Sequence, residues 1–249
     1  QKHLAGTLWG RHRSSALSPS PRQRLTSIYN EIANAPICHA ISEATVEAQE
    51  SFGDDLDSCE PLALAIENEE VSVVLRENNV TSRTACKLIS DLGKAHKVEK
   101  AVSVFTWSKN RAKEGTPGTE CNVFHYNALI SACERAGLWG CALRVLAEMA
   151  DEGITADTVT YSTLISAVGK GKRWDLGLQL LTRMKDEGIA PNVVTYNALI
   201  SSCEKASRLE EAMAVFALLV DDQLQPDLIS YSALLSACEK VGEWERAWR

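Results

Sequence analysis

The sequence has none of the residue patterns on which most enzymes depend. Its five histidines are scattered, and no glycine-rich phosphate loop, nucleophile elbow or zinc-deaminase pattern occurs. The eight cysteines include no C-x-x-C pair, so a zinc site has no support. The acidic run SFGDDLDSCE at 51–60 lacks the ligand spacing of a calcium loop. We therefore expect no catalytic residue, no metal, no cofactor and no small-molecule substrate.

Long apolar runs are also absent. None approaches the roughly 20 residues that a membrane-spanning helix needs, so no membrane partner is expected. The net charge of −7 would argue against a nucleic-acid partner if it were evenly spread. It is instead concentrated: residues 1–30 carry +5, residues 31–79 carry −11, and residues 80–249 carry only −1. Charge therefore does not exclude a polyanion as a partner of the long third segment.

What the sequence does contain is a repeat of 35 residues without gaps. One tyrosine recurs at this interval, at Tyr126, Tyr161, Tyr196 and Tyr231. Three complete units and a truncated fourth follow one another, at 123–157, 158–192, 193–227 and 228–249. Self-similarity at a fixed period of this length is typical of solenoid proteins. Positions are numbered below as slots, so that the first residue of each unit is slot 1.

Each unit is predicted to form two helices joined by a turn. The first helix is expected to run from the tyrosine to about slot 14, and Gly137 and Gly242 fall where the chain must turn. The second helix is exemplified by Leu209–Val220. The expected N-caps are the hydroxyls before the tyrosine: Thr160, Thr195 and Ser230. The sequence thus predicts an all-α fold, an α-solenoid that forms a right-handed superhelix of helix-turn-helix repeats.

A helical wheel separates two faces of the first helix. Slots 4, 7, 8 and 11 are apolar in every unit and form the predicted core face. Cysteine and valine exchange at slot 11, which marks these thiols as core residues: Cys133, Val168, Cys203 and Cys238. Slots 2, 5, 9 and 13 lie on the opposite face. There each unit repeats one order, namely an apolar residue, a short amide or hydroxyl, a serine and a cation.

The cations at slot 13 are Arg135, Lys170, Lys205 and Lys240. In a stacked array they would form a basic line beside small hydrogen-bonding residues, which suits a single-stranded polyanion. A solvated helix face is a plainer explanation for any single member of the line. Glutamates at slot 12, next to three of these cations, weaken the line and argue against strong nonspecific binding.

The repeat resembles the pentatricopeptide repeat family. The resemblance rests on the VTYNALI opening, the Lys or Arg that follows it, the EA and MKDEGI stretches of the second helix and the PN or PD ending. It covers Val123 to Arg249 closely. The tetratricopeptide repeat is the nearest alternative, and Ala212 and Phe216 fit its A-x-x-x-F element, but its period is shorter and its aromatic pattern differs.

The resemblance implies single-stranded RNA binding, with one base read by each unit. The implied base-reading residues stand at slot 5 and at the last slot: Asn127 with Asp157, Ser162 with Asn192, Asn197 with Asp227, and Ser232 without its partner. The implied base-sandwiching residues stand at slot 2: Phe124, Val159, Val194 and Ile229. The three complete pairs are implied readers of uracil, adenine and uracil, which gives a core target of 5′-UAU-3′. Short amides, hydroxyls and carboxylates suit a Watson–Crick edge whatever the family.

Ahead of these units, residues 82–122 align as a lengthened copy, here called the leading unit. It places Cys86 at the base-reading slot and Lys94 at the cation slot. Because a thiol lacks the donors and acceptors of an amide, we expect this unit to cap the array or to contact the RNA backbone. Lys94 completes the set of expected phosphate-contacting residues, with Arg135, Lys170, Lys205 and Lys240.

The remaining residues are predicted to carry weaker structure. Residues 61–122 read as degenerate or capping helical repeats, with a helix at Leu62–Asn78 ahead of the leading unit. Residues 1–60 form a basic and then acidic region that is expected to be largely disordered or weakly helical. The start at Gln1 and the end inside a second helix suggest a fragment, so a catalytic domain after Arg249 stays an open alternative.

We therefore predict a protein that is not an enzyme and binds single-stranded RNA sequence-selectively. It would act in organellar RNA processing, stability or translation, with other RNA-processing proteins as partners. Localisation in a chloroplast or mitochondrion follows from the resemblance and from the Arg- and Ser-rich, acid-free start of the chain. The alternative function is a protein–protein interaction solenoid without nucleic-acid binding.

Overall fold

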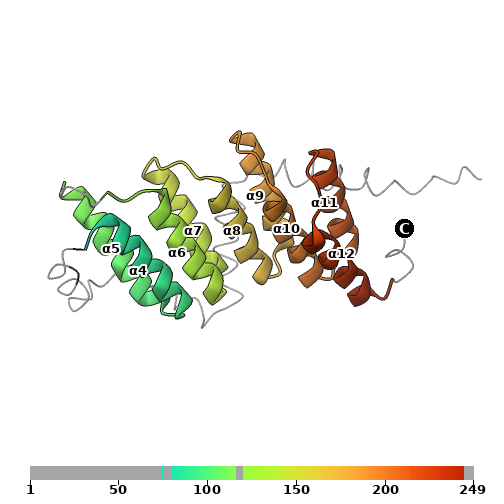
Figure 1. Cartoon of the computed structure of the whole chain (residues 1–249), viewed down its shortest axis with the longest axis horizontal. Coiled ribbons are helices and arrows are strands. Elements are labelled where there is room, and N and C mark those ends of the chain that lie inside the picture. The colour runs from blue at the N-terminus through green and yellow to red at the C-terminus, as the bar shows by residue number, and fades with distance from the viewer. Residues whose placement is uncertain (1–74, 76–79, 116–119, 244–249) are drawn as a thin grey trace, which may run out of the picture.

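The computed structural model describes residues 75, 80–115 and 120–243. The elements within these residues are all α-helices: α4 (Ser82–Lys94), α5 (Val98–Lys113), α6 (Val123–Ala136), α7 (Trp139–Asp151), α8 (Thr158–Lys170), α9 (Trp174–Asp186), α10 (Val193–Lys205), α11 (Leu209–Asp221) and α12 (Leu228–Val241). Figure 1 shows them following one another along the long axis of the molecule in chain order.

The helices form hairpins, and the hairpins stack into an array. The first helices of the units, α4, α6, α8, α10 and α12, form one row in which each packs on the next. The second helices, α5, α7, α9 and α11, each pack on the first helix of their own hairpin and of the following one. The predicted all-α solenoid of helix-turn-helix repeats is confirmed (Figure 1). Because a solenoid buries its core between neighbouring units, equivalent slots line up along the array.

The core face of the first helices lies where the helical wheel predicts it. In the three complete units every residue at slots 4, 7, 8 and 11 is at most 1% exposed. Each buried Leu or Ile among them contributes about 1.5–3 kcal/mol of transfer free energy. The hydroxyls of Tyr161 and Tyr196 donate to Glu187 and Asp222, near the end of the second helix of the same unit. In the fourth unit Tyr231 is exposed, and the residues predicted to begin the second helix of that unit lie outside the described part of the chain.

The first helices begin three residues earlier than predicted, and the assignment of Thr160, Thr195 and Ser230 as N-caps is wrong. The N-cap is the residue that ends the preceding unit: Asn122, Asp157, Asn192 or Asp227. Its side chain accepts from an N–H of the first turn, and the side chain at N3 accepts from the N–H of the N-cap, which completes a capping box. Asp and Asn cap at least as well as the hydroxyls, which leaves the hydroxyls free for a second role.

The turns and the contacts between hairpins use glycine, tryptophan and arginine. Gly137 and Gly242 end α6 and α12 with φ of 77° and 78°, which confirms the predicted turns. Trp139 and Trp174 begin second helices and contact the next unit. The guanidinium of Arg173 lies 5.6 Å from the Trp139 ring centre, and that of Arg208 lies 4.9 Å from the Trp174 ring centre.

The cysteines at slot 11 are core residues, as predicted: Cys133, Cys203 and Cys238 are free and buried. Cys141 on α7 differs, because it is disulfide-bonded, a state that the cysteine spacing did not indicate.

Several predictions fall outside the part of the chain that the structure describes. Residues 1–60 and, apart from Leu75, the helix predicted at Leu62–Asn78 belong to this group. The leading unit is described as the hairpin α4–α5. Among the helices described, none is long and apolar enough to cross a membrane. Nor do residues 80–115 and 120–243 hold a group of three or more His, Cys, Asp or Glu able to bind a metal ion.

Candidate nucleic-acid interface

The face of the first helices opposite the core carries a groove of about 600 Å³. Its lining comes from α6, α8, α10 and the start of α12, so it crosses three complete units. The predicted RNA-contacting residues that line it are Val159, Ser162, Asn192, Val194, Asn197, Asp227 and Ile229. The fold therefore brings slot 2, slot 5 and the last slot of successive units to one continuous surface.

In the first unit the two predicted base-reading residues bind each other. Asn127 Nδ2 donates to Asp157 Oδ1 at 3.1 Å. A hydroxyl of the next unit completes the pair, because Thr160 Oγ1 donates to Asn127 Oδ1 at 2.6 Å. Since the amide oxygen accepts a hydroxyl and the amide nitrogen donates to a carboxylate, the Asn127 amide is held in one orientation. The third unit repeats the arrangement at 2.9 and 2.6 Å with Asn197, Asp227 and Ser230.

Hydrogen bonds keep the aspartates of these pairs ionised. Burial opposes ionisation of Asp157, but the N–H and hydroxyl of Thr160 and the amide of Asn127 outweigh it and lower the pKa of Asp157. The N–H of Ser230 and the amide of Asn197 lower the pKa of Asp227. Each of these side chains is therefore a carboxylate near neutral pH, which can only accept hydrogen bonds.

The second unit replaces the pair with smaller, neutral groups. Ser162 Oγ donates to the Thr158 carbonyl oxygen at 2.7 Å and shares a hydrogen bond of 2.8 Å with Thr195 Oγ1. Its predicted partner, Asn192, accepts from Thr195 Oγ1 at 3.0 Å. The same hydroxyl thus links the two predicted reading residues. Ser162 is 9% exposed and Asn197 is 7% exposed, so only a small part of each side chain faces the groove.

The apolar residues at slot 2 remain exposed, although they belong to otherwise well-packed helices. Their exposed fractions are 66% for Phe124, 59% for Val159, 63% for Val194 and 61% for Ile229. Three of them line the groove, one from each of three successive first helices. Apolar side chains spaced in this way offer flat surfaces on which the faces of unstacked bases can pack.

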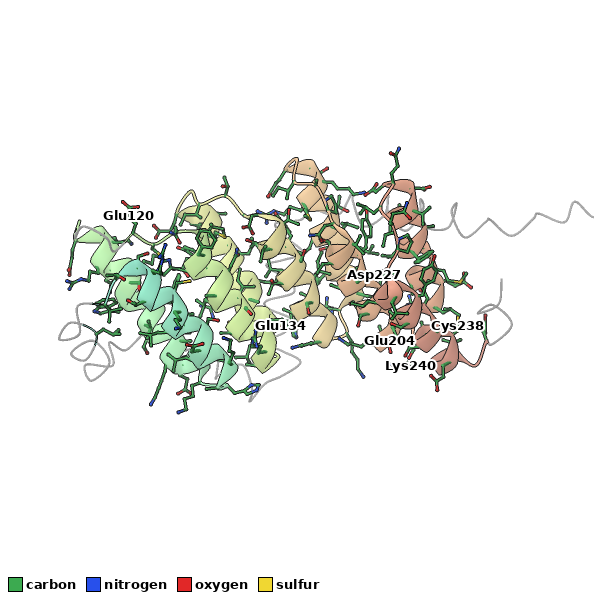
Figure 2. The ribbon with its side chains drawn as sticks, in the orientation of Figure 1. Glu120, Glu134, Glu204, Asp227, Cys238 and Lys240 are labelled. Atoms are coloured by element: carbon green, nitrogen blue, oxygen red, sulfur yellow. The ribbon has the colours of Figure 1, made fainter. Side chains whose placement is uncertain are left out.

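The cations at slot 13 divide into two kinds. Lys170 pairs with Glu134 at 2.8 Å, and Lys240 pairs with Glu204 at 2.7 Å. Figure 2 labels Glu134 and, toward the C-terminal end of the array, Glu204 and Lys240. In both pairs the glutamate belongs to slot 12 of the preceding unit. The slot-9 serines of the second and fourth units, Ser166 and Ser236, donate to the same two carboxylates. The glutamates therefore neutralise the cation of the next unit, and not the cation that follows them in the sequence.

Arg135 and Lys205 are exposed and have no acidic partner within ion-pair distance in the part of the chain that the structure describes. Lys94 pairs with Asp91 of its own helix at 3.1 Å, and both side chains are more than half exposed. The five predicted phosphate-contacting residues are thus not equivalent, although all five lie in the last turn of a first helix.

The ends of the array lack the base-reading network. Cys86 Sγ donates to the Phe124 carbonyl oxygen at 3.4 Å. Ser232 is exposed, and its hydroxyl donates to the Ile229 carbonyl oxygen of its own helix at 3.0 Å. Within the described residues, Cys86 makes no hydrogen bond to Asn122, the capping residue at the end of its unit.

Two contributors to this surface are missed by the sequence analysis. The polar residue at slot 3, present as Thr160, Thr195 or Ser230, is fully buried and orients the reading residue of the unit before it. Its recurrence between two apolar slots was the available signal. Glu134 lines the groove and binds Lys170 across the interface. No local signal marks that contact, since the two residues belong to different units.

Comparison with protein families points to one family. A family model described as a pentatricopeptide repeat domain matches residues 115–171, 144–206 and 179–243, together just over half of the chain. An Arabidopsis thaliana protein named LOW PHOTOSYNTHETIC EFFICIENCY 1, chloroplastic, is 35% identical over 93 residues. That match covers 37% of this chain and 14% of the relative.

Solved structures share the fold. The pentatricopeptide repeat protein PPR10 from maize has a TM-score of 0.57 at 24% identity, over 94% of this chain and 33% of that one. PPR10 in complex with an 18-nt psaJ RNA element has a TM-score of 0.50 at 23% identity, over 90% of this chain and 33% of that one. The PPR domain of Arabidopsis thaliana protein-only RNase P 1 in complex with tRNA has a TM-score of 0.52 at 16% identity, over 65% of this chain and 82% of that one. This chain thus spans a third of PPR10, and the likeness at these identities concerns the fold.

Proposed function

The chain belongs to the pentatricopeptide repeat family, and on this premise we propose that it binds single-stranded RNA sequence-selectively, one base per unit. The observation that carries the proposal is the groove. It gathers apolar side chains for base faces and amides, hydroxyls and carboxylates for base edges from successive units. The same slots recur at a fixed spacing, which suits a polymer with a regular repeat of its own.

The oriented amides support uracil as the partner of the first and third units. In both units the amide oxygen of Asn127 or Asn197 is occupied by a hydroxyl, so the amide can offer only N–H to a base. The carboxylate beside it accepts. An N–H donor next to an acceptor complements a carbonyl next to an N–H, which the Watson–Crick edge of uracil presents.

The second unit supports a larger base. Ser162 and Asn192 both line the groove, and Ser162 has a smaller side chain than the asparagine at the same slot of the first and third units. Asn192 is neutral, and its Oδ1 already accepts from the N–H and the hydroxyl of Thr195, so its amide offers N–H groups to a base. Such a donor suits the ring nitrogen of adenine, which accepts. The proposed core target is therefore 5′-UAU-3′.

The relatives support the class of ligand and the compartment. PPR10 and the domain from protein-only RNase P 1 were solved with RNA, and the Arabidopsis relative is named chloroplastic. We extend these properties to this chain as part of the proposal, with a role in organellar RNA processing, stability or translation. The pentatricopeptide units themselves are proposed to bind RNA and not to catalyse a reaction on it.

Binding to short labelled oligonucleotides tests the proposal. The chain should bind a single strand with a central UAU about tenfold or more tighter than strands with UUU or AAA, since one matched base contact is worth about 1–3 kcal/mol. Asn197→Ala should remove the preference for uracil at the third base. Asp186→Ala, an exposed change at the end of α9, is the matched control and should leave the preference intact.

Two outcomes would contradict the proposal. Equal affinity for all strands at physiological salt would do so, and so would an Asn197→Ala variant with unchanged base preference and unchanged melting temperature. Either result would favour a protein-interaction solenoid in place of an RNA-binding array.

A further inference from the structure

The first helices meet at two kinds of interface, which alternate along the array. At α4/α6 and α8/α10, slot 12 is glycine. A Cβ on Gly93 would lie 2.6 Å from Ala132 Cβ, and a Cβ on Gly169 would lie 2.9 Å from Ser202 Cβ. No side chain fits at these two contacts, which we call the glycine interfaces. At α6/α8 and α10/α12 the same slot holds Glu134 or Glu204, and we call these the glutamate interfaces.

At the glutamate interfaces the cation of the following unit is occupied. Glu134 and Glu204 are only 16% and 14% exposed, and each binds a lysine and a serine of the next first helix. Lys170 also donates to the Glu134 carbonyl oxygen at 2.9 Å. Burial opposes ionisation of Glu204, but Lys240 and Ser236 outweigh it and lower its pKa. The glutamate and the lysine of each pair therefore compensate each other's charge, and the pair adds no net charge to the groove.

At the glycine interfaces the cation has no such partner. Slot 12 has no side chain there, and among the described residues no acid of the preceding unit forms an ion pair with Arg135 or Lys205. Both are exposed in the last turn of a first helix, at slot 13, which the helical wheel assigns to the face opposite the core.

The capping residues follow the same alternation. The glutamate interfaces carry the ionised Asp157 and Asp227, whereas the glycine interfaces carry the neutral Asn122 and Asn192. Counting cap, slot 12 and slot 13 together, each glutamate interface is net negative and each glycine interface is net positive. The sign of the charge thus changes from one interface to the next.

We infer that the array contacts the RNA backbone at every second unit, through Arg135 and Lys205 at the glycine interfaces, while Lys170 and Lys240 bind neighbouring units together. This inference rests on the proposed function and adds to it which cations meet phosphate. Each phosphate neutralised on a single strand contributes about 0.7 to the slope of log affinity against log salt. Two contacts predict a slope of about 1.4, whereas five equivalent cations predict about 3.5.

A salt titration of binding to the UAU strand tests the inference on the whole chain. The wild-type slope is expected near 1.4, and Lys205→Gln should lower it by about 0.7. Glu204→Gln should raise both the affinity and the slope, the latter by about 0.7, because it releases Lys240 toward the groove. Glu134→Gln should act in the same way through Lys170. Asp186→Asn makes the same change of net charge on a second helix and should leave the slope unchanged.

The outcomes separate this inference from the proposed function. If RNA binds but the wild-type slope is near 3.5, or if Glu204→Gln matches Asp186→Asn, the alternation in backbone contacts is wrong and RNA binding stands. If no RNA binds, the proposed function fails first. Should Glu204→Gln lower the melting temperature, the double variant Glu204→Gln/Lys240→Gln decides, because an unchanged slope supports the inference and a fall of about 0.7 overturns it.

Discussion

The glycine and glutamate interfaces come from the same repeat, yet they differ in whether a charge pair joins their first helices. At the glutamate interfaces the pairs join first helices, as in Lys240 with Glu204. At the glycine interfaces the charge pairs lie along the row of second helices: Lys185 of α9 pairs with Asp222, the residue after α11, at 2.8 Å, and Lys109 of α5 pairs with Glu152, the residue after α7, at 2.8 Å. Slot 12 therefore decides whether the cation of the next first helix is paired with a glutamate, and hence what charge that cation leaves for a ligand.

The two kinds of interface also differ in the hydrogen bonds that hold the predicted base-reading side chains in place. Each glutamate interface holds an Asn, an Asp and a hydroxyl in one hydrogen-bonded chain, of which Asn127, Asp157 and Thr160 are an example. The glycine interface at α8/α10 holds Ser162 and a neutral cap in its place. The hydrogen-bonding groups of the base-reading residues and the pairing of the slot-13 cations thus change together from one interface to the next. The array is therefore better described with a period of two units than of one.

The largest effect is expected from filling a glycine interface. A glycine-to-alanine change within a helix normally stabilises it by about 0.5–1 kcal/mol. Gly93→Ala should instead lower the free energy of unfolding by up to about 3 kcal/mol, because the new Cβ meets the Cβ and Cα of Ala132, which have no rotamer to change. Denaturant unfolding measures the loss. Glu134→Ala, at the same slot of a glutamate interface, should cost below about 1 kcal/mol, and a stabilised Gly93→Ala would contradict close packing.

A smaller effect is expected from removing the slot-3 hydroxyls. Thr160→Val keeps the shape of the side chain but removes the single hydroxyl proton that lies between Asn127 Oδ1 and the ionised Asp157 Oδ1. The expected cost is about 2 kcal/mol. Thr195→Val, at a glycine interface, breaks hydrogen bonds to the neutral Ser162 and Asn192 and should cost about 1 kcal/mol. Equal losses for the two variants would remove this difference between the interfaces.

Acid should act on the caps of the glutamate interfaces. Asp157 and Asp227 have folded pKa values below their ordinary ones, so their contribution is present above the ordinary carboxyl pKa of about 4 and is lost as the pH falls through the lowered values. Asn192 at a glycine interface cannot titrate. The variant Asp157→Asn/Asp227→Asn should therefore lose less melting temperature than the wild type between pH 7 and pH 3, by a few degrees. The same loss in both proteins would show that the caps do not contribute.

Much of the fold could be predicted because burial is periodic. Tyr161, Leu164 and Ile165 are fully buried at the slots that the helical wheel selects, since a wheel needs only the spacing of residues within one unit. The same reasoning brought Ser162 and Asn197 to one face. Their roles in RNA binding remain predictions.

Other features were out of reach because they depend on choices between similar groups or on neighbouring units. Asp157 and Thr160 can both cap a helix, and only the structure shows that the aspartate does so. Glu204 precedes Lys205 in the sequence, but adjacent residues on a helix do not face each other. The glutamate reaches Lys240 instead, one unit further along the array.

The smallest effect is expected from the ion pair on the second helices of a glycine interface. Lys185 and Asp222 are each about a third exposed, so solvent screens their attraction, and Lys185 also lies 5.8 Å from the ring centre of Tyr196. A double-mutant cycle with Lys185→Gln and Asp222→Asn should give a coupling below about 1 kcal/mol. Because this pair lies on the other row of helices, Lys185→Gln should leave the salt slope of RNA binding as it is, whereas Lys205→Gln, with the same loss of charge, lowers it. A shared decrease in both variants would mean that the backbone contacts extend to the second helices, and the division of charge between the two rows would no longer explain which cations meet RNA.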